Sequence, residues 1–271
     1  MKKLLLLFLF LCVVNLKAQT PHQITFTDKD CIPKGSSTLT WEAVNKKLNA
    51  VFGDGSILDT FPMLGRADNI VLPFEIIIDG DITTISDYAF ASCDKLTSVN
   101  MPKVTRIEIN GFYDCTSLEN MNVPAVTRVE NSAFSNCTSL KSVDMPAATK
   151  IESYTFSNCT SLESADMPAA ITIESGVFAS CTSLKSVNIP AVTTIESVAF
   201  DNCTSLETIT ILNLTPPTLG DDVFGDPSNR YFLVPKSCTL RVADLSAADR
   251  YKKDKGWKSQ FLPRKILPVS P

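Results

Sequence analysis

Six cysteines recur at a fixed interval through the middle of the chain, and they are the first residues whose chemistry has to be explained. They stand 22 residues apart, at Cys93, Cys115, Cys137, Cys159, Cys181 and Cys203. Thiols in an oxidising compartment normally form disulfides. In a stack of identical coils, however, neighbouring cysteine side chains point in parallel and do not converge. The spacing therefore favours free, buried thiols with a weak S–H donor, and pairing between adjacent coils is the alternative.

Five glutamates repeat at the same interval and suggest acid–base chemistry. They are Glu108, Glu130, Glu152, Glu174 and Glu196. Two carboxylates about 5 Å apart are the arrangement of a retaining glycosidase. Here the pair would recur in every coil without a cleft, and Arg106, Arg128 and Lys150 stand two residues before the first three glutamates. We therefore expect a partly neutralised ladder, with weak cation binding near Glu174 and Glu196 as the alternative.

The chain has one histidine, His22, in its N-terminal region. This count argues against Ser-His and Cys-His catalytic pairs and against multi-histidine metal sites. The sequence also has no glycine-rich phosphate-binding loop. We therefore expect a protein that is not an enzyme, with no catalytic residues, no cofactor and no metal site.

These ladders require a scaffold that brings residues 22 positions apart side by side. The same interval separates the phenylalanines from Phe90 to Phe200 and the prolines from Pro102 to Pro190. A fixed period between about 20 and 50 residues predicts a solenoid, in which each coil contacts only its neighbours. Parallel stacking would place equivalent residues about 4.8 Å apart.

One coil, starting at Cys181, shows the expected elements. Val187 to Ile189 alternates between inward and outward side chains, as in a short strand, and Pro190 ends it. Val192 to Ile195 fits a second extended piece. Ser197 to Phe200 is long enough only for a helical turn, of the 3₁₀ type.

A second charged ladder alternates in sign from coil to coil. It consists of Glu119, Lys141, Glu163, Lys185 and Glu207. Opposite charges in neighbouring coils attract, so this ladder fixes the register and needs no ligand.

Residues 82–211 carry the pattern C-x-x-L-x-x-V-x-M-P-x-x-V-x-x-I-E-x-x-A-F-x-x-C. This pattern resembles the BspA-like leucine-rich repeats of bacterial surface antigens, except that the five glutamates stand where that family more often has glycine. The resemblance implies an α/β leucine-rich-repeat solenoid of 22-residue coils, mostly β and loop. Short parallel strands lie on its concave side, helical turns join them, and caps cover both ends. It also implies a non-enzymatic surface protein, since some relatives are adhesins for host matrix proteins.

The flanking segments complete the expected domain organisation. Residues 1–18 fit a signal peptide cleaved near Ala18, because Lys2 and Lys3 precede an apolar run too short for a membrane span. Residues 19–81 form an N-terminal cap with one helix near 41–52 and strands at 70–72 and 74–78. Residues 212–271 form the C-terminal cap, with a strand at 231–234 and a helix at 243–255 that ends at Gly256 and Trp257. Cys31 and Cys238 lie in opposite caps and should not pair.

The charge of the chain limits its partners. Removal of the leader takes Lys2, Lys3 and Lys17 with it and lowers the net charge from −4 to −7, which argues against nucleic-acid binding through bulk electrostatics. Residues 250–265 are locally basic, with Tyr251, Trp257 and Phe261 interleaved. We expect a solvated cap helix over buried aromatic rings there, with contact to an anionic glycan or lipid as the alternative.

The expected binding surface is a row of small polar residues on the strands. The candidates on the concave face are Asn100, Asn122, Asp144, Asp166 and Asn188. Because Trp, Tyr and Arg are absent from this row, aromatic anchors are expected only in the caps. The sequence thus predicts a secreted or cell-surface, monomeric interaction protein of adhesin-like type that binds a protein or glycan. The alternatives are an accessory glycan-binding protein for polysaccharide capture, a structural role in the envelope, and a row that is merely solvated.

Overall fold

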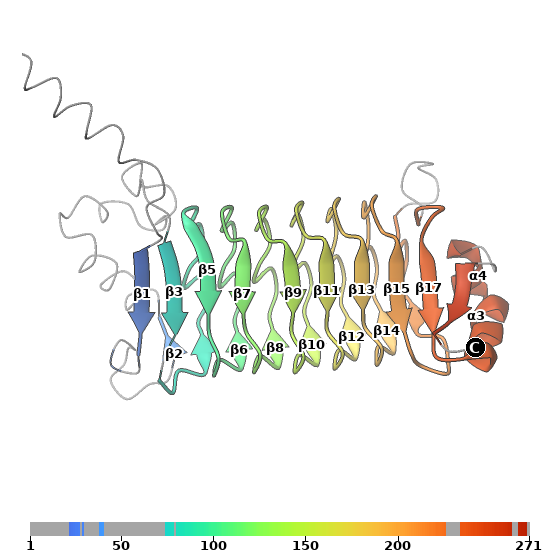
Figure 1. Cartoon of the computed structure of the whole chain (residues 1–271), viewed down its shortest axis with the longest axis horizontal. Coiled ribbons are helices and arrows are strands. Elements are labelled where there is room, and N and C mark those ends of the chain that lie inside the picture. The colour runs from blue at the N-terminus through green and yellow to red at the C-terminus, as the bar shows by residue number, and fades with distance from the viewer. Residues whose placement is uncertain are drawn as a thin grey trace, which may run out of the picture.

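The computed structural model describes residues 22–27, 29, 38–40, 74–78, 80–225, 234–261 and 265–269. In these ranges the chain forms a stack of coils with one hydrophobic core along its length (Figure 1). The helix expected near 41–52 and the strand expected at 70–72 lie outside the described residues, as does nearly all of the strand expected at 231–234. The strand expected at 74–78 is confirmed as β3.

Each coil contributes one longer and one shorter strand. The longer strands are β1 (His22–Phe26), β3 (Phe74–Ile78), β5 (Leu96–Asn100), β7 (Asn120–Asn122), β9 (Ser142–Asp144), β11 (Ser164–Asp166), β13 (Ser186–Asn188), β15 (Thr208–Ile211), β17 (Thr239–Val242) and β18 (Ile266–Pro268). The shorter ones are β2 (Thr38–Leu39), β4 (Thr84–Ile85), β6 (Arg106–Ile107), β8 (Arg128–Val129), β10 (Lys150–Ile151), β12 (Thr172–Ile173), β14 (Thr194–Ile195) and β16 (Thr218–Leu219). We call these two sides of the stack the long-strand side and the short-strand side.

All strand pairs are parallel, and between β4 and β15 the paired residues are 22 apart, as the repeat predicts, whereas the pairing of β3 with β5 contains a register shift. Val187 of β13, for example, lies opposite Ala165 of β11. The short-strand side is one continuous sheet from β2 to β16. The strands alternate, so their inward residues are buried and the neighbours of these face solvent, although Met121 of β7 and Leu219 of β16 are only partly buried.

The long-strand side is interrupted once. Its strands form two sheets, one from β1 to β7 and one from β9 to β18, with no ladder between β7 and β9. In most other coils the residue after the long strand donates its N–H to the next coil, as Met101 does to the Asn122 carbonyl at 2.9 Å. The equivalent bond from Val123 to Asp144 is absent, although both residues are described. The second and third regular coils are therefore joined less tightly on this side.

The third side of each coil, which we call the turn side, differs from the expected helical turn. It contains two hydrogen-bonded turns, and each coil places two residues in the left-handed backbone region. In the coil of Ser197 to Phe200 these are Val198 at φ 52° and Asn202 at φ 57°. The turns are also bonded from coil to coil, as in Phe200 N–H to the Val223 carbonyl at 2.8 Å.

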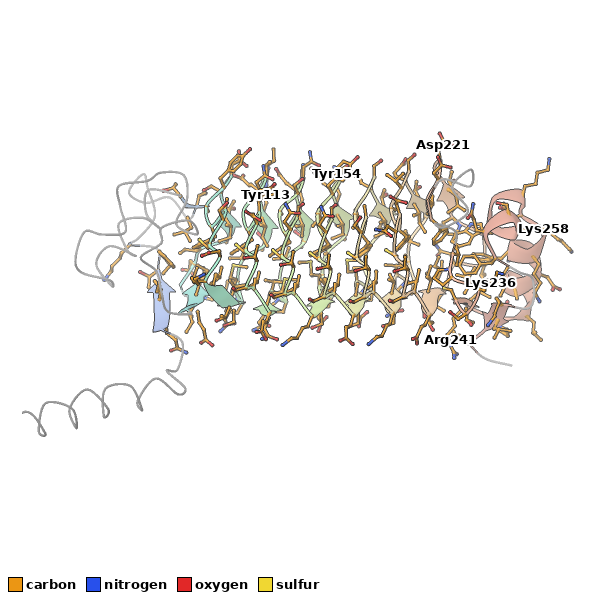
Figure 2. The ribbon with its side chains drawn as sticks, turned by 90° about the horizontal axis from the view of Figure 1, so that it is seen from above. Tyr113, Tyr154, Asp221, Lys236, Arg241 and Lys258 are labelled. Carbon is orange, nitrogen blue, oxygen red and sulfur yellow. The ribbon has the colours of Figure 1, made fainter. Side chains whose placement is uncertain are left out.

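Backbone hydrogen bonds between coils thus occur on all three sides. They impose the same spacing of about 4.8 Å everywhere. Leucine-rich-repeat proteins curve where helices, which pack about 8–10 Å apart, widen one side. Because no helix widens the turn side of the described coils, the axis is almost straight in two perpendicular views (Figures 1 and 2). The expected concave face is accordingly close to flat.

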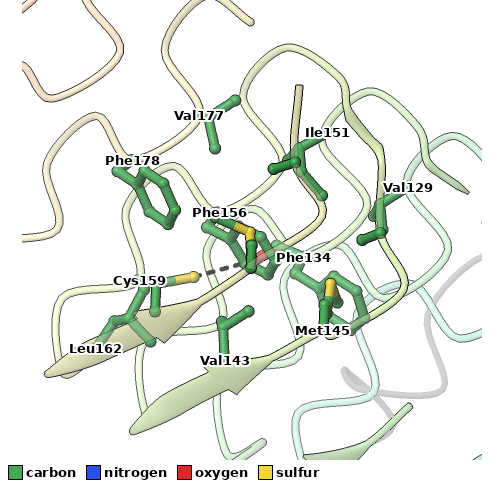
Figure 3. Close-up of a cluster of buried hydrophobic side chains, with 14 of the residues drawn as sticks. Val129, Phe134, Val143, Met145, Ile151, Phe156, Cys159, Leu162, Val177 and Phe178 are labelled. Atoms are coloured by element: carbon green, nitrogen blue, oxygen red, sulfur yellow. Dashed lines mark hydrogen bonds between the residues drawn. The ribbon is translucent and has the colours of Figure 1, made fainter. Parts of the chain in front are cut away.

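The core is built from residues of one type stacked along the axis. Phenylalanine rings from Phe90 to Phe224 lie nearly parallel to their neighbours, with centroids 5.0–5.7 Å apart. Beside them lie the cysteines, and inward Leu, Val, Ile and Met side chains fill the remaining space (Figure 3). Burying a phenylalanine in every coil supplies the apolar area that a 22-residue coil lacks alone.

The C-terminal end is covered by two short helices, α3 (Leu245–Lys253) and α4 (Lys255–Gln260). The sequence predicted one helix ending at Gly256, and this was wrong. Asp254 ends α3 and also begins α4, since its carboxylate accepts the Trp257 N–H at 3.1 Å. The Trp257 ring is buried, and its Nε1–H donates to the Pro217 carbonyl at 2.9 Å, which fastens the cap to the last coil.

Candidate functional site

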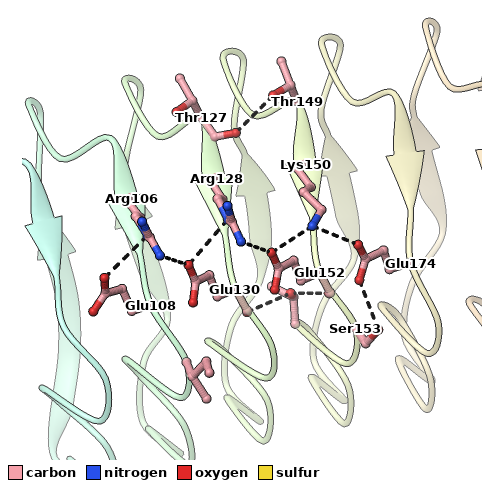
Figure 4. A network of polar contacts seen from close by, with 12 residues as sticks. Arg106, Glu108, Thr127, Arg128, Glu130, Thr149, Lys150, Glu152, Ser153 and Glu174 are labelled. Carbon is pink, nitrogen blue, oxygen red and sulfur yellow. Dashed lines mark hydrogen bonds and ion pairs between the residues drawn. The ribbon is translucent and has the colours of Figure 1, made fainter.

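The glutamate ladder forms a zigzag of ion pairs along the short-strand side (Figure 4). Each basic residue contacts the glutamate of its own coil and that of the next. Arg128, for example, lies 3.4 Å from Glu130 and 2.7 Å from Glu152. Lys150 continues the pattern, 3.0 Å from Glu152 and 3.4 Å from Glu174. The expected partial neutralisation is confirmed.

This geometry does not suit acid–base catalysis. The two central carboxylates, Glu130 and Glu152, are 6% and 8% exposed, and each is contacted by two cations. Both carboxylates are thus engaged in ion pairs with neighbouring side chains. The hydrogen bond to Glu152 raises the pKa of Lys150. The ladder is a device that joins coils.

Cation binding at the C-terminal end of the ladder gains no support. Glu174 already contacts Lys150 and accepts a hydrogen bond from Ser153 Oγ at 3.2 Å. Within the described ranges, no group of three or more His, Cys, Asp or Glu side chains is arranged to hold a metal ion. Glu196 follows without a basic residue at the position two before it, since Thr194 stands there.

The predicted binding row lies on the long-strand side, as expected from the strand pattern. Asn100, Asn122, Asp144 and Asp166 are exposed and Asn188 is half-buried. The Asn122 amide donates to Asn100 Oδ1 at 2.7 Å, and the Asn188 amide donates to Asp166 Oδ1 at 2.8 Å. The strand register places Asp144 opposite Asp166, next to the interruption between β7 and β9. Two carboxylates thus stand side by side at the centre of an otherwise amide-bearing row.

The alternating charges flank this row and pair between coils. Lys141 contacts Glu119, and Lys185 Nζ lies 2.7 Å from Glu163. The hydrogen bond from Lys185 lowers the pKa of Glu163. The pairing confirms the predicted register device.

The cysteines are free and buried, as the spacing predicted. This holds for the six repeat cysteines and for Cys238, whereas Cys31 lies outside the described residues. Five of the six thiols donate to the phenylalanine carbonyl of the preceding coil, as Cys159 Sγ does to Phe134 at 3.2 Å (Figure 3). Burial raises the pKa of the Cys159 thiol to about 12. The Cys159 thiol is therefore a packing residue and not a nucleophile.

The aromatic residues are distributed differently from the prediction. Tyr251, Trp257 and Phe261 of the C-terminal cap are buried, which confirms the expected solvated helix over aromatic rings but leaves none of the three as an anchor. Tyr88 and Tyr154, in the coils, are instead 55% and 47% exposed. They share one position of the repeat, two residues after the glutamate ladder. The sequence offered a signal, because Asn110, Ser132 and Gly176 occupy the same position in other coils and are residues typical of exposed turns.

Comparison with known proteins agrees with this architecture. Six copies of the model for the BspA type leucine rich repeat region match residues 74–172 and 105–231, so the chain belongs to this family. A leucine-rich repeat protein of T. pallidum is similar in structure, with a TM-score of 0.51 and 24% identity over 56% of this chain and 75% of that one.

Two further solved structures are more distant. A leucine-rich repeat protein from Bacteroides ovatus has a TM-score of 0.34 and 20% identity, over 62% of this chain and 63% of that one. A leucine rich cell surface protein from Faecalibacterium prausnitzii has a TM-score of 0.36 and 19% identity, over 65% and 61%. No curated protein sequence matches the chain. None of the helices in the described ranges combines the length and the apolar character needed to cross a membrane.

Proposed function

We propose that the protein is a non-enzymatic interaction protein, displayed outside the cell, that binds a macromolecular partner in an adhesin-like manner. The observation that carries this proposal is the long-strand side, an extended face whose outward residues are not part of the hydrophobic core. Repeat proteins use such faces for binding. The basic and apolar N-terminal residues support export, and membership of the BspA-type family supports an interaction role.

We place the contact on the row Asn100, Asn122, Asp144, Asp166 and Asn188. Carboxylate and amide groups at regular intervals can hydrogen-bond the backbone and side chains of an extended polypeptide. The centre of the row is the pair Asp144 and Asp166, which lie opposite each other, and Asp166 accepts the amide of Asn188. A partner with cationic or N–H groups would compensate this pair. The same row favours the second candidate, glycan capture, because hydroxyl groups can also donate to carboxylates.

A binding screen tests the proposal. The purified protein is passed over immobilised matrix proteins and a glycan panel at two salt concentrations, beside Asp144→Ala/Asp166→Ala. The proposal predicts saturable binding to a protein that weakens in the variant and at high salt. The matched control is Asp221→Ala, which removes an exposed carboxylate from the turn side. Protein binding that is equal in wild type and variant would exclude the row as the contact, and glycan binding lost in the variant would favour the second candidate.

A further inference from the structure

The turn side carries the aromatic rings that reach solvent. Among the side chains whose burial the structure describes, Tyr88 and Tyr154 are the only exposed aromatic ones. Tyr113 lies on the same side, half-buried, and its hydroxyl accepts the Asn136 amide at 3.1 Å. Figure 2 shows Tyr113 and Tyr154 along the same long edge of the stack. We call Tyr88, Tyr113 and Tyr154 the tyrosine ridge.

The ring of Tyr154 is supported from below by the next coil. Gly176 occupies the equivalent position there, and a Cβ on it would lie 2.4 Å from Tyr154 Cε1. Only glycine leaves room for the ring at this place, and its φ of 64° also suits glycine. The ring is therefore held against backbone on one side while almost half of its surface stays open to solvent.

The two exposed tyrosines occupy an unfavourable backbone region. Their φ angles are 57° and 58°, where bulky residues are uncommon. Other coils place Asn110, Ser132, Gly176, Val198 and Asp222 at this position. Each tyrosine therefore carries a backbone strain that glycine at the same position would not. Burial does not offset this cost, so an external role accounts for the two rings better than stability does.

The surroundings of the rings define the chemistry of a partner. Backbone hydrogen bonds keep the position in register from coil to coil, so Asn110 and Ser132 stand between Tyr88 and Tyr154. In each coil the turn side comprises six residues, from 87–92 in the first coil to 197–202 in the sixth, and it continues at 221–225 in the last. None of these residues is a lysine or an arginine. The charged groups there are aspartates. This side therefore repels anions, and it offers amides, hydroxyls and open aromatic faces.

We infer that the tyrosine ridge binds a neutral polysaccharide that runs along the solenoid axis. The C–H face of a pyranose ring packs on a supported tyrosine ring, and amide and hydroxyl groups bond to the hydroxyls of the sugar. Tyr88 and Tyr154 are three coils apart, about 14 Å at the parallel-strand spacing. Each therefore contacts a different sugar, with Asn110 and Ser132 facing the units between. This site lies on another side from the Asp144 row and is independent of the proposed adhesin-like function.

Affinity electrophoresis of the purified protein tests this inference. Native gels contain soluble neutral glucans, mannan or xyloglucan, and parallel gels contain anionic alginate or pectin. At least one neutral polysaccharide should retard the protein, and the anionic ones should not. Removing one ring should weaken binding about tenfold, since a lost aromatic contact is worth about 1.4 kcal/mol. Tyr88→Ala/Tyr154→Ala should abolish retardation, and Tyr88→Phe/Tyr154→Phe should retain most of it.

Three variants test whether the tyrosine rings themselves make the contact. Gly176→Ala displaces the Tyr154 ring without removing it and should weaken binding. Ile171→Ala removes a 45% exposed side chain from the corner before β12 and should change nothing. Asp144→Ala/Asp166→Ala should also change nothing. Retardation that survives loss of both rings, retardation lost with the Asp144 row, or no retardation by any neutral polysaccharide would overturn the inference.

Discussion

Extending the glutamate ladder by one cation should stabilise the solenoid. Thr172 lies in register with Lys150, and an arginine there would repeat the contacts that Arg128 makes at 3.4 and 2.7 Å. Its partners would be Glu174 and Glu196, the next two glutamates of the ladder. We therefore expect Thr172→Arg to raise the free energy of unfolding.

The magnitude follows from exposure. The existing cations of the ladder are 44–48% exposed, so each pair contributes near the surface value of about 0.2–1 kcal/mol. Two pairs, less the entropy of fixing a long side chain, give about 0.5–1 kcal/mol. For a chain of this size that corresponds to a rise in Tm of about 1–4 °C.

Thermal unfolding by circular dichroism measures the shift, with Thr172→Gln as the uncharged control of similar length. The difference between the two variants should shrink in about 1 M salt, where the screening length falls to about 3 Å. It should also become smaller when Glu196→Gln is added to both, because only the pair with Glu174 then remains. An equal Tm for the Arg and Gln variants would refute the view that the ladder joins coils by charge.

Two other expectations concern the backbone and the thiols. Val198→Asn should raise the free energy of unfolding by about 0.5–1 kcal/mol, because Val198 is a β-branched residue in the left-handed region, where another coil uses Asn110. Urea unfolding measures this gain. An equal gain from Val198→Thr, which is also β-branched, would contradict the reasoning. Burial raises the pKa of the Cys159 thiol from 9.0 to about 12. Between these two pH values the thiol ionises in the unfolded chain but stays protonated in the folded protein. The free energy of unfolding therefore falls as the pH rises through this range. Stability measured from about pH 8 to 11 should therefore decline less steeply in Cys159→Ala, and parallel curves would show that this thiol is not responsible.

Much of the fold could be predicted because the repeat constrains it many times over. Six equivalent cysteines and their inward Leu, Val and Phe neighbours determine the register, the strands and the core, and a solenoid has few other ways to bury them. Free thiols also followed from the stacking geometry. Such arguments use the features that all coils share.

The sequence-based prediction and the structure differ where one coil departs from the others, and where the local backbone conformation determines the structure. The left-handed residues of the turn side were missed because tyrosine and valine at that position do not signal such a backbone, although Asn110 and Gly176 do. The straight axis follows from those turns. The second cap helix depends on one side chain, Asp254, serving two helices. The tyrosine ridge was overlooked because aromatic anchors were sought only in the caps.

The interruption between β7 and β9 bears on how the stack comes apart. A repeat protein behaves as a one-dimensional array, in which a boundary between folded and unfolded coils costs the coupling energy of the interface where it forms. Each missing backbone hydrogen bond lowers that coupling by about 1 kcal/mol. The interface between these two strands lacks the ladder bonds that join other neighbouring long strands. We therefore expect partial unfolding from either end to stop most readily between β7 and β9, so that the continuous solenoid unfolds as two cooperative blocks.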